Sequence, residues 1–261
     1  SLLQWLGGLS TILIASFLVE SILDKEKFNI EIFDLENLKI ISLFYILVTI
    51  FFSIIFYFYE SYSFDEALRL SMSLVSTSNS FHDNGSILID QSLSFKSIMI
   101  LAMIFGSISV SLHYKSFNHG IKYYFRNKKF LSVIIFLLFL VLILSLYISS
   151  ITKIPVLSLF IDSLFLLISF ISTTGLIPEN LYDQGLLNKL LLFLLMFSLI
   201  GGAVNSTTGG IKVSRVIFIA KFIKRELYKL ANPRIILSKE SISQSDNTFR
   251  IFIFCILFLF S

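Results

Sequence analysis

Long runs without a charged residue constrain this chain more than any other feature of its sequence. Residues 40–59 form an uncharged run of 20, which matches the roughly 20 apolar residues that a helix needs to cross a bilayer. Residues 97–114, 130–152 and 187–211 give three more long apolar runs. Charged residues make up 15% of the chain, whereas soluble domains carry about 25%. The sequence therefore predicts an all-α integral membrane protein.

Two shorter apolar runs, 67–81 and 158–176, each lie between two of the long runs. Basic stretches at 115–129 and 212–229 follow the second long run of each round. Lys and Arg mark the cytoplasmic side of a membrane protein, so the short runs belong to the outer side. A run too short to cross, which is entered and left on one face, is expected to be a re-entrant helix.

The two rounds align without gaps at an offset of 96 residues. The stretch "EALRLSMSLVSTSN" (66–79) lies over "DSLFLLISFISTTG" (162–175), and both contain S-x-x-S-T near their ends. Glu66 aligns with Asp162, and an acid at the start of each short helix suits the positive end of the helix dipole. Such internal similarity predicts a duplicated unit: a spanning helix, a re-entrant helix with a polar turn, and a second spanning helix.

The polar turn at the end of each short helix has the chemistry of an ion path. In "FISTTGL" (170–176), three hydroxyl residues and a glycine follow an apolar helix. Non-helical backbone at membrane depth is tolerated only where it is buried in protein or lines a water-filled cavity. Its carbonyl oxygens can then replace the hydration shell of a cation, and Gly175 allows the backbone angles that point successive carbonyls inward.

Several motifs resemble the TrkH/TrkG/KtrB superfamily of potassium uptake permeases, in order along essentially the whole chain. "FISTTGLIPENL" is similar to a filter turn of that family, with Leu176 in place of Phe, and "IGGAVNSTTGGIKVSRV" (200–216) is similar to its glycine-rich signature. Shorter matches are "QWLGGL" (4–9), "FHDNGSI" (81–87) and "LHYKSF" (112–117). The resemblance implies repeated units of spanning helix, re-entrant pore helix with a filter turn, and spanning helix, around one pore.

The resemblance also implies roles for the matched residues. The filter turns would bind the transported ion through Ser172, Thr173, Thr174 and Gly175 in one unit and Ser76, Thr77, Ser78 and Asn79 in the other. The gating loop would comprise Gly201, Gly202, Asn205, Ser206, Thr207, Thr208, Gly209 and Gly210, with Lys212 and Arg215 at the basic cytoplasmic end. Potassium, as the transported substrate, is the only metal expected at these residues, and neither a catalytic residue nor a cofactor is expected.

The same resemblance divides the chain into pore units, as a piece of a longer protein. The expected segments are 1–19, the last helix of unit one; 20–39, a cytoplasmic connector; 40–114, unit two; 115–129, a basic cytoplasmic connector; 130–211, unit three; 212–249, a second basic cytoplasmic connector; and 250–261, the truncated start of unit four.

Potassium uptake across a bacterial inner membrane is the function that the resemblance implies. The expected partners are the potassium ion and membrane lipid, a cytosolic nucleotide-binding regulatory subunit, and a second copy of the full-length protein in a homodimer. Basic stretches beside membrane spans are expected to touch anionic lipid rather than nucleic acid.

Two other function classes stay open at this stage. Asn79 stands where the family pattern has glycine, which leaves a non-conducting remnant or a truncated subunit as the alternative. A membrane enzyme would need a nucleophile and base, or a metal constellation, on one face. His82 and Asp83 have no second histidine nearby and are expected to lie in a solvated loop, so we expect that the chain is not an enzyme.

Overall fold

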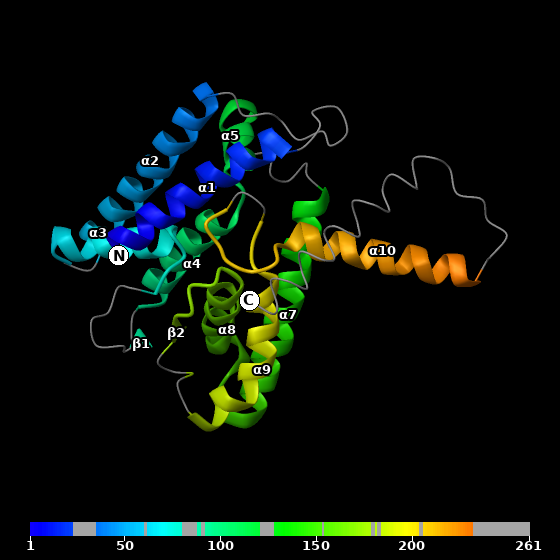
Figure 1. Cartoon of the computed structure of the whole chain (residues 1–261). Coiled ribbons are helices and arrows are strands. Elements are labelled where there is room, and N and C mark those ends of the chain that lie inside the picture. The colour runs from blue at the N-terminus through cyan, green and yellow to red at the C-terminus, as the bar shows by residue number, and fades with distance from the viewer. Residues whose placement is uncertain are drawn as a thin grey trace.

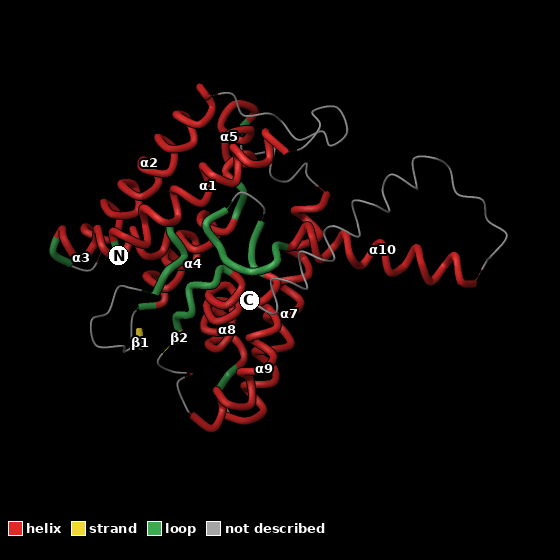
Figure 2. The backbone as a smooth tube through the Cα atoms, viewed as in Figure 1, coloured by secondary structure: helices red, strands yellow, loops and turns green. Residues whose placement is uncertain are grey.

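Apart from two short strands, the described elements of the structure, a computed structural model, are all helices (Figure 1; Figure 2). It describes residues 1–22, 35–59, 62–79, 88–89, 92–120, 128–152, 154–178, 181, 184–203 and 206–231. The elements are α1 (Leu2–Ile22), α2 (Leu35–Tyr59), α3 (Phe64–Val75), β1 (Leu88–Ile89), α4 (Leu93–Ser107), α5 (Val110–His119), α7 (Lys128–Thr152), α8 (Val156–Ile171), β2 (Ile177–Pro178), α9 (Gln184–Ile200) and α10 (Val213–Ala231).

The two short helices that follow long ones, α3 and α8, are each enclosed by their neighbours. Helix α3 packs against α1, α2 and α4, and α8 packs against α4, α7 and α9 (Figure 1). Helix α4 therefore contacts both short helices. The parallel pair of β1 and β2, in which Leu88 lies beside Ile177, joins the same two parts of the chain. Helix α10 leads away from the other helices (Figure 1).

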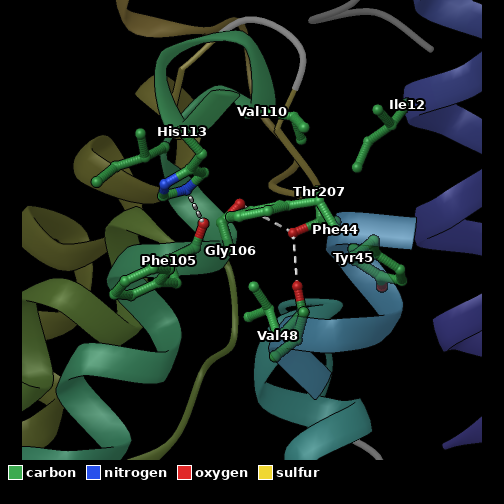
Figure 3. Close-up of a pocket in the computed structure, with 11 residues that line it drawn as sticks. Ile12, Phe44, Tyr45, Val48, Phe105, Gly106, Val110, His113 and Thr207 are labelled. Atoms are coloured by element: carbon green, nitrogen blue, oxygen red, sulfur yellow. Dashed lines mark hydrogen bonds between the residues drawn. The ribbon is translucent and has the colours of Figure 1, made fainter. Parts of the chain in front are cut away.

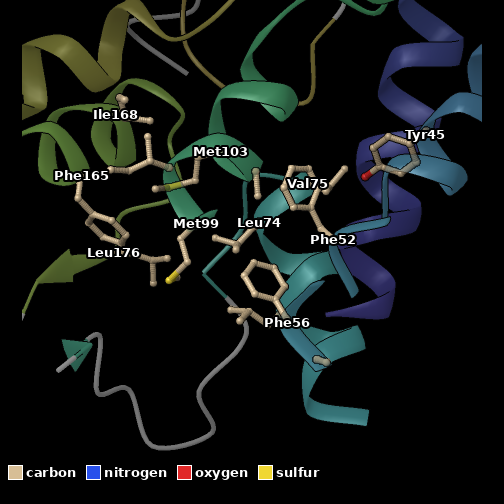
Figure 4. Packing of buried hydrophobic residues seen from close by; sticks show 14 of the residues in the cluster. Tyr45, Phe52, Phe56, Leu74, Val75, Met99, Met103, Phe165, Ile168 and Leu176 are labelled. Atoms are coloured by element: carbon tan, nitrogen blue, oxygen red, sulfur yellow. The ribbon is translucent and has the colours of Figure 1, made fainter. Parts of the chain in front are cut away.

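The apolar core consists of two clusters that meet at α8. The first is formed mainly by α1 to α4, and its fully buried side chains include Phe56 and Phe95. Figure 4 shows Met103 of α4 close to Phe165 of α8 within this cluster. The second cluster joins α7, α8 and α9, with Leu167 fully buried. Because α8 contributes to both clusters, its position is fixed from two sides.

One helix of the described chain, Lys39–Tyr59, is long and apolar enough to cross a membrane, judged by length and composition alone. Shorter apolar helices cover 93–107, 137–152 and 188–200, among others. The run at 40–59 thus forms a helix of spanning length.

The expectation of one continuous span over 97–114 is wrong. Helix α4 ends at Ser107 and α5 begins at Val110, with Ile108 in an extended conformation between them. A break in a helix frees backbone groups that need other partners. Here the carbonyl oxygens of Gly106 and Ser107 accept hydrogen bonds from a loop about 100 residues later in the chain, so the break is stabilised by a distant segment.

An acid does begin α3, as expected, but not α8. The Ser63 hydroxyl and backbone amide both donate to the Glu66 carboxylate, at 2.8 and 3.0 Å, and these bonds, the hydroxyl's first, lower the pKa of Glu66. Helix α8 begins at Val156, directly after Pro155, because a proline ring is tolerated at a helix start but not in its interior. Asp162 consequently lies inside α8, where the dipole argument does not apply.

Asp162 instead forms a buried ion pair with Lys96 of α4. The ammonium nitrogen lies 2.7 Å from a carboxylate oxygen, and the side chains are 6% and 8% exposed. Two charges removed from water need each other, since an isolated buried charge costs several kcal/mol. The pair joins α4 to α8 beside the apolar contact between them, and a charge-assisted hydrogen bond is more directional than that contact.

Removing one partner of this ion pair should destabilise the protein strongly. Lys96→Met leaves the Asp162 carboxylate buried without its cation, and breaking a buried pair from one side costs about 3 to 5 kcal/mol. The double variant Lys96→Met with Asp162→Leu should recover most of that loss, because apolar side chains can replace a buried pair. The thermal unfolding midpoints of the purified proteins in detergent measure both effects. An equal loss in the two variants would contradict this view of the pair.

Candidate ion pathway

The turn after α8, residues 172–175, is held by backbone amides that bond back into the helix. Its Thr173 and Gly175 have positive φ angles of 62° and 74°, a conformation that is costly for threonine and free of strain for glycine. The hydroxyl groups of Ser172 and Thr174 lie 2.7 Å apart. The amide bonds run from Ser172 to the Ile168 carbonyl (2.7 Å), from Thr173 to Phe170 (3.1 Å) and from Thr174 to Ser169 (2.9 Å).

The turn after α3, residues 76–79, repeats this geometry at the offset of 96. Thr77 has a positive φ of 51°, as its counterpart Thr173 does. The hydroxyl groups of Ser76 and Ser78 lie 3.1 Å apart. The amide bonds run from Ser76 to the Met72 carbonyl (3.0 Å), from Thr77 to Leu74 (3.1 Å) and from Ser78 to Ser73 (2.8 Å). Each donor and each acceptor of these three bonds lies 96 residues before its counterpart in the turn after α8.

The two turns differ at their fourth position. Gly175 has a φ of 74°, whereas the described non-glycine residues with positive φ are Thr77, Thr173 and Lys212, so Asn79 does not share the conformation of its counterpart. The side chain of Asn79 is exposed. The left-handed conformation costs a residue with a Cβ about 1 kcal/mol or more, a cost that glycine at the same position does not have.

The loop between α9 and α10 folds back on the end of α9. Gly201 and Gly210 have positive φ angles of 67° and 81°, and a Cβ on Gly210 would lie 2.8 Å from the Leu199 carbonyl oxygen. Backbone amides of Ile211 and Lys212 donate to carbonyls of α9, each at 2.8 Å. The chain thus leaves the helix and returns beside it, and only glycine fits at the two close approaches.

This loop binds both polar turns directly. The Thr207 hydroxyl lies 2.9 Å from the carbonyl oxygen of Val75, the last residue before the turn at 76–79. The Gly209 amide donates to the Thr173 hydroxyl of the other turn, at 2.9 Å. Both turns and the loop therefore form one connected polar cluster, made of segments that are about 35 to 130 residues apart in sequence.

The same loop donates hydrogen bonds to the carbonyl groups that are freed at the break between α4 and α5. The Thr207 hydroxyl also lies 3.0 Å from the Gly106 carbonyl oxygen, and the Ala203 amide donates to the Ser107 carbonyl at 3.0 Å. Figure 3 shows Thr207 beside Gly106 and Val110, at a small apolar cavity whose wall also includes Tyr45 of α2. Two interrupted helices thus face each other, and each supplies partners for the freed backbone groups of the other.

The ligand atoms that this cluster offers are neutral oxygens of carbonyl and hydroxyl groups. Within the described residues there is no group of three or more His, Cys, Asp or Glu side chains that could hold a metal ion. Neutral oxygens of this kind suit a dehydrated monovalent cation.

The remaining expected site residues have mixed outcomes. The Lys212 ammonium donates to the backbone carbonyl of Thr208 and lies 3.1 Å from its hydroxyl, so it binds the loop as well as following it. The Arg215 amide donates to the Lys212 carbonyl in the first turn of α10. Asn205 lies outside the described residues, as do His82 and Asp83.

Sequence reasoning did not identify Gly106 and Gly8 as parts of this cluster. A Cβ on Gly106 would lie 2.8 Å from the Val75 carbonyl oxygen, and one on Gly8 would lie 3.3 Å from the Ser76 side chain. The "GSIS" stretch at 106–109, small and polar within an apolar run, was the available signal for the first. Gly8 had only its place in "QWLGGL".

Comparison with known proteins agrees with this geometry. No protein-family model matches the sequence. The chain is 31% identical over 227 residues to an uncharacterised cation transporter, MJ1485, of Methanocaldococcus jannaschii, covering 86% of this chain and 44% of that protein. It is 28% identical over 252 residues to the Trk system potassium uptake protein TrkH of Vibrio parahaemolyticus, covering 90% and 51%. The crystal structure of the potassium transporter TrkH from Vibrio parahaemolyticus superposes with a TM-score of 0.75 at 26% identity, over 90% of this chain and 50% of that one.

The chain is a TrkH-family homologue. It spans about half the length of the curated relatives that it matches. The resemblance read from the motifs is confirmed, and so is the helical fold, which matches a membrane transporter. Because the TrkH family consists of transporters, the expectation that the chain is not an enzyme is confirmed as well.

Gly106→Ala should displace the loop and destabilise this TrkH homologue, because the added methyl group has no room beside Val75 and Thr207. Overpacking of this kind costs about 1 to 3 kcal/mol. Gly7→Ala is the matched control, since nothing lies within 4 Å of a Cβ built there. The unfolding midpoints of the two purified variants should fall for Gly106→Ala and stay level or rise for Gly7→Ala. The same midpoint for both would contradict the observed packing.

Proposed function

We propose that this chain forms the central part of a gated pore that takes up potassium. In this proposal each unit consists of a spanning helix, a re-entrant pore helix with a filter turn, and a second spanning helix. The turns at 76–79 and 172–175 belong to the selectivity filter of units two and three. The loop at 201–210 is the gate.

The observation that carries the proposal is the connected cluster of two turns and one loop. Its hydrogen bonds run from Thr207 to Val75, directly before one turn, and from Gly209 to Thr173 of the other turn. A glycine-rich, non-helical segment thus contacts both ends of the pair. A gate must block the same path that the filter lines, so direct contact between the two supports the assignment. The recurrence of the same amide bonds at the offset of 96 supports the repeated unit.

The chemistry of the turns supports a potassium ion as the substrate. Backbone carbonyls can replace the hydration shell of a monovalent cation without adding a fixed charge. The relatives with a curated substrate name are potassium uptake proteins. Asn205 and Lys212, at the two ends of the polar part of the loop, would belong to the gate and its cytoplasmic side.

The location and partners of the protein follow from the same proposal. The helix α10 would begin on the cytoplasmic side of the cell membrane, where its exposed Lys221 and Lys224 can contact anionic lipid. A cytosolic nucleotide-binding regulatory subunit would act from this side, and the full-length protein would form a homodimer. The segments proposed from the sequence, from 1–19 to 250–261, keep their assigned places in this arrangement.

A non-conducting remnant is the second candidate, and Asn79 is the specific observation that favours it. A filter turn that lacks the glycine conformation at its fourth position has lost part of its geometry. The full reading frame separates the two candidates. Two further S/T-x-G-x turns in an intact frame would support transport, whereas stop codons on either side of this segment would support the remnant.

The direct test is rescue of a potassium-uptake-deficient bacterium by the protein encoded in the full reading frame. Growth in low potassium is expected for the wild type and for Gly7→Ala, because a Cβ at Gly7 meets nothing within 4 Å. Gly175→Asp should abolish growth, because a carboxylate would occupy the narrowest point and the residue would also have a strained positive φ. Membrane levels are measured for all three. A wild type that reaches the membrane and gives no growth would refute potassium uptake.

Thr207→Val should open the gate more readily. Valine keeps the shape of threonine but loses the hydroxyl that binds the Val75 and Gly106 carbonyls. The loss of about 1 kcal/mol of hydrogen bonding should raise the initial rate of rubidium uptake about fivefold. Thr207→Ser retains the hydroxyl and is the control, with a rate close to that of the wild type. Equal rates in all three would show that this hydroxyl does not hold the gate closed.

A further inference from the structure

The peptide bond between the third and fourth turn residues points in opposite directions in the two polar turns. After α8, the amide of Gly175 faces back into the helix end and donates to the Ser169 carbonyl at 3.2 Å. After α3, the carbonyl oxygen of Ser78 faces back instead, and accepts a hydrogen bond from the Ser73 hydroxyl at 2.6 Å. Ser73 and Ser169 are alignment partners, so the same helix position meets an amide in one turn and a carbonyl in the other.

The residue at the fourth position explains the difference. Gly175 has a positive φ of 74°, which Asn79 does not share. In the turn after α8 the Ser169 hydroxyl is buried and has no hydrogen-bond partner among the described residues. In the turn after α3 the equivalent Ser73 hydroxyl donates to the Ser78 carbonyl. A hydrogen bond inside a buried helix end is stronger than one exposed to water. Ser73 thus stabilises the reversed peptide.

The hydrogen bond from Ser73 turns the Ser78 carbonyl oxygen toward the end of α3. Ser73 is 1% exposed, so the Ser78 carbonyl oxygen faces a buried side chain. The equivalent carbonyl of Thr174 is on the opposite side of its peptide from the amide that faces the helix. The number of carbonyl oxygens around a cation is one of the two explanations offered for discrimination between potassium and sodium.

We propose that Ser73 and Asn79 together set the ion selectivity of this protein by holding the Ser78 carbonyl out of the filter. The proposal rests on the proposed pore function and goes beyond it, since it names the residues that weaken selectivity. A filter with one carbonyl withdrawn discriminates poorly between potassium and sodium. The turn after α8, in which Gly175 has a positive φ, has no carbonyl withdrawn in this way.

The test compares the concentrations of sodium and potassium that half-inhibit rubidium uptake by the protein encoded in the full reading frame. Ser73→Ala removes the hydroxyl that binds the carbonyl, and Asn79→Gly permits the positive φ. The half-inhibiting sodium concentration divided by that of potassium should rise in each single variant. In the double variant it should rise further, by about tenfold in total, which is about 1.4 kcal/mol of added discrimination. Ser169→Ala is the matched variant, and it should shift the ratio less than Ser73→Ala does.

The outcomes separate this inference from the proposed function. A wild type that does not transport refutes both. A wild type that transports, with a double variant that reaches the membrane at the same level but keeps the wild-type ratio or transports nothing, refutes the selectivity role alone. An equal shift of the concentration ratio in Ser73→Ala and Ser169→Ala would also overturn it. Of these two serines, Ser73 is the one whose hydroxyl binds the carbonyl of the third turn residue.

Discussion

Two interrupted helices bind each other's freed backbone groups, and the rest of this structure depends on these hydrogen bonds. The break between α4 and α5 and the loop between α9 and α10 both leave backbone groups without helical partners, and in an apolar surrounding each such group costs several kcal/mol. Thr207 and Ala203 bind the freed carbonyls of Gly106 and Ser107. The amides of Ala203 and Thr207 are satisfied by the same bonds, so each interruption supplies partners for the other.

This arrangement explains why small residues gather at the cluster. Backbone can approach backbone only where no Cβ intervenes. A Cβ on Gly106 or Gly202 would lie within 3 Å of another segment, and one on Gly201 would lie within 3 Å of the far end of its own loop. The close approach in turn lets the loop reach both polar turns. In the proposed pore, the gate therefore cannot move without breaking hydrogen bonds to both turns. The filter and the gate would then respond to each other without an intermediate element.

The features that the sequence could predict are those with local causes. The turns after α3 and α8 follow short helices and carry hydroxyl residues at matching positions, and their amides bond to the preceding helical turn in the same pattern. The break at Ile108 was missed because its stabilising partner, Thr207, lies about 100 residues later. The ion pair of Asp162 is hidden from the sequence in the same way, since its partner Lys96 is 66 residues earlier. The start of α8 has a local cause in Pro155.

The two turns also show how far a shared backbone pattern extends. Three successive amide bonds match between them, and the difference is confined to the next peptide, where glycine in one turn meets asparagine in the other. The Ser169 hydroxyl has no hydrogen-bond partner among the described residues, whereas the Ser73 hydroxyl at the equivalent helix position donates to the Ser78 carbonyl. The Asn79 side chain is exposed, whereas the Ser73 hydroxyl that binds the turned carbonyl belongs to a buried residue. In the proposed pore, the two filter turns therefore share their amide bonds but differ in the carbonyl oxygens that they offer to an ion.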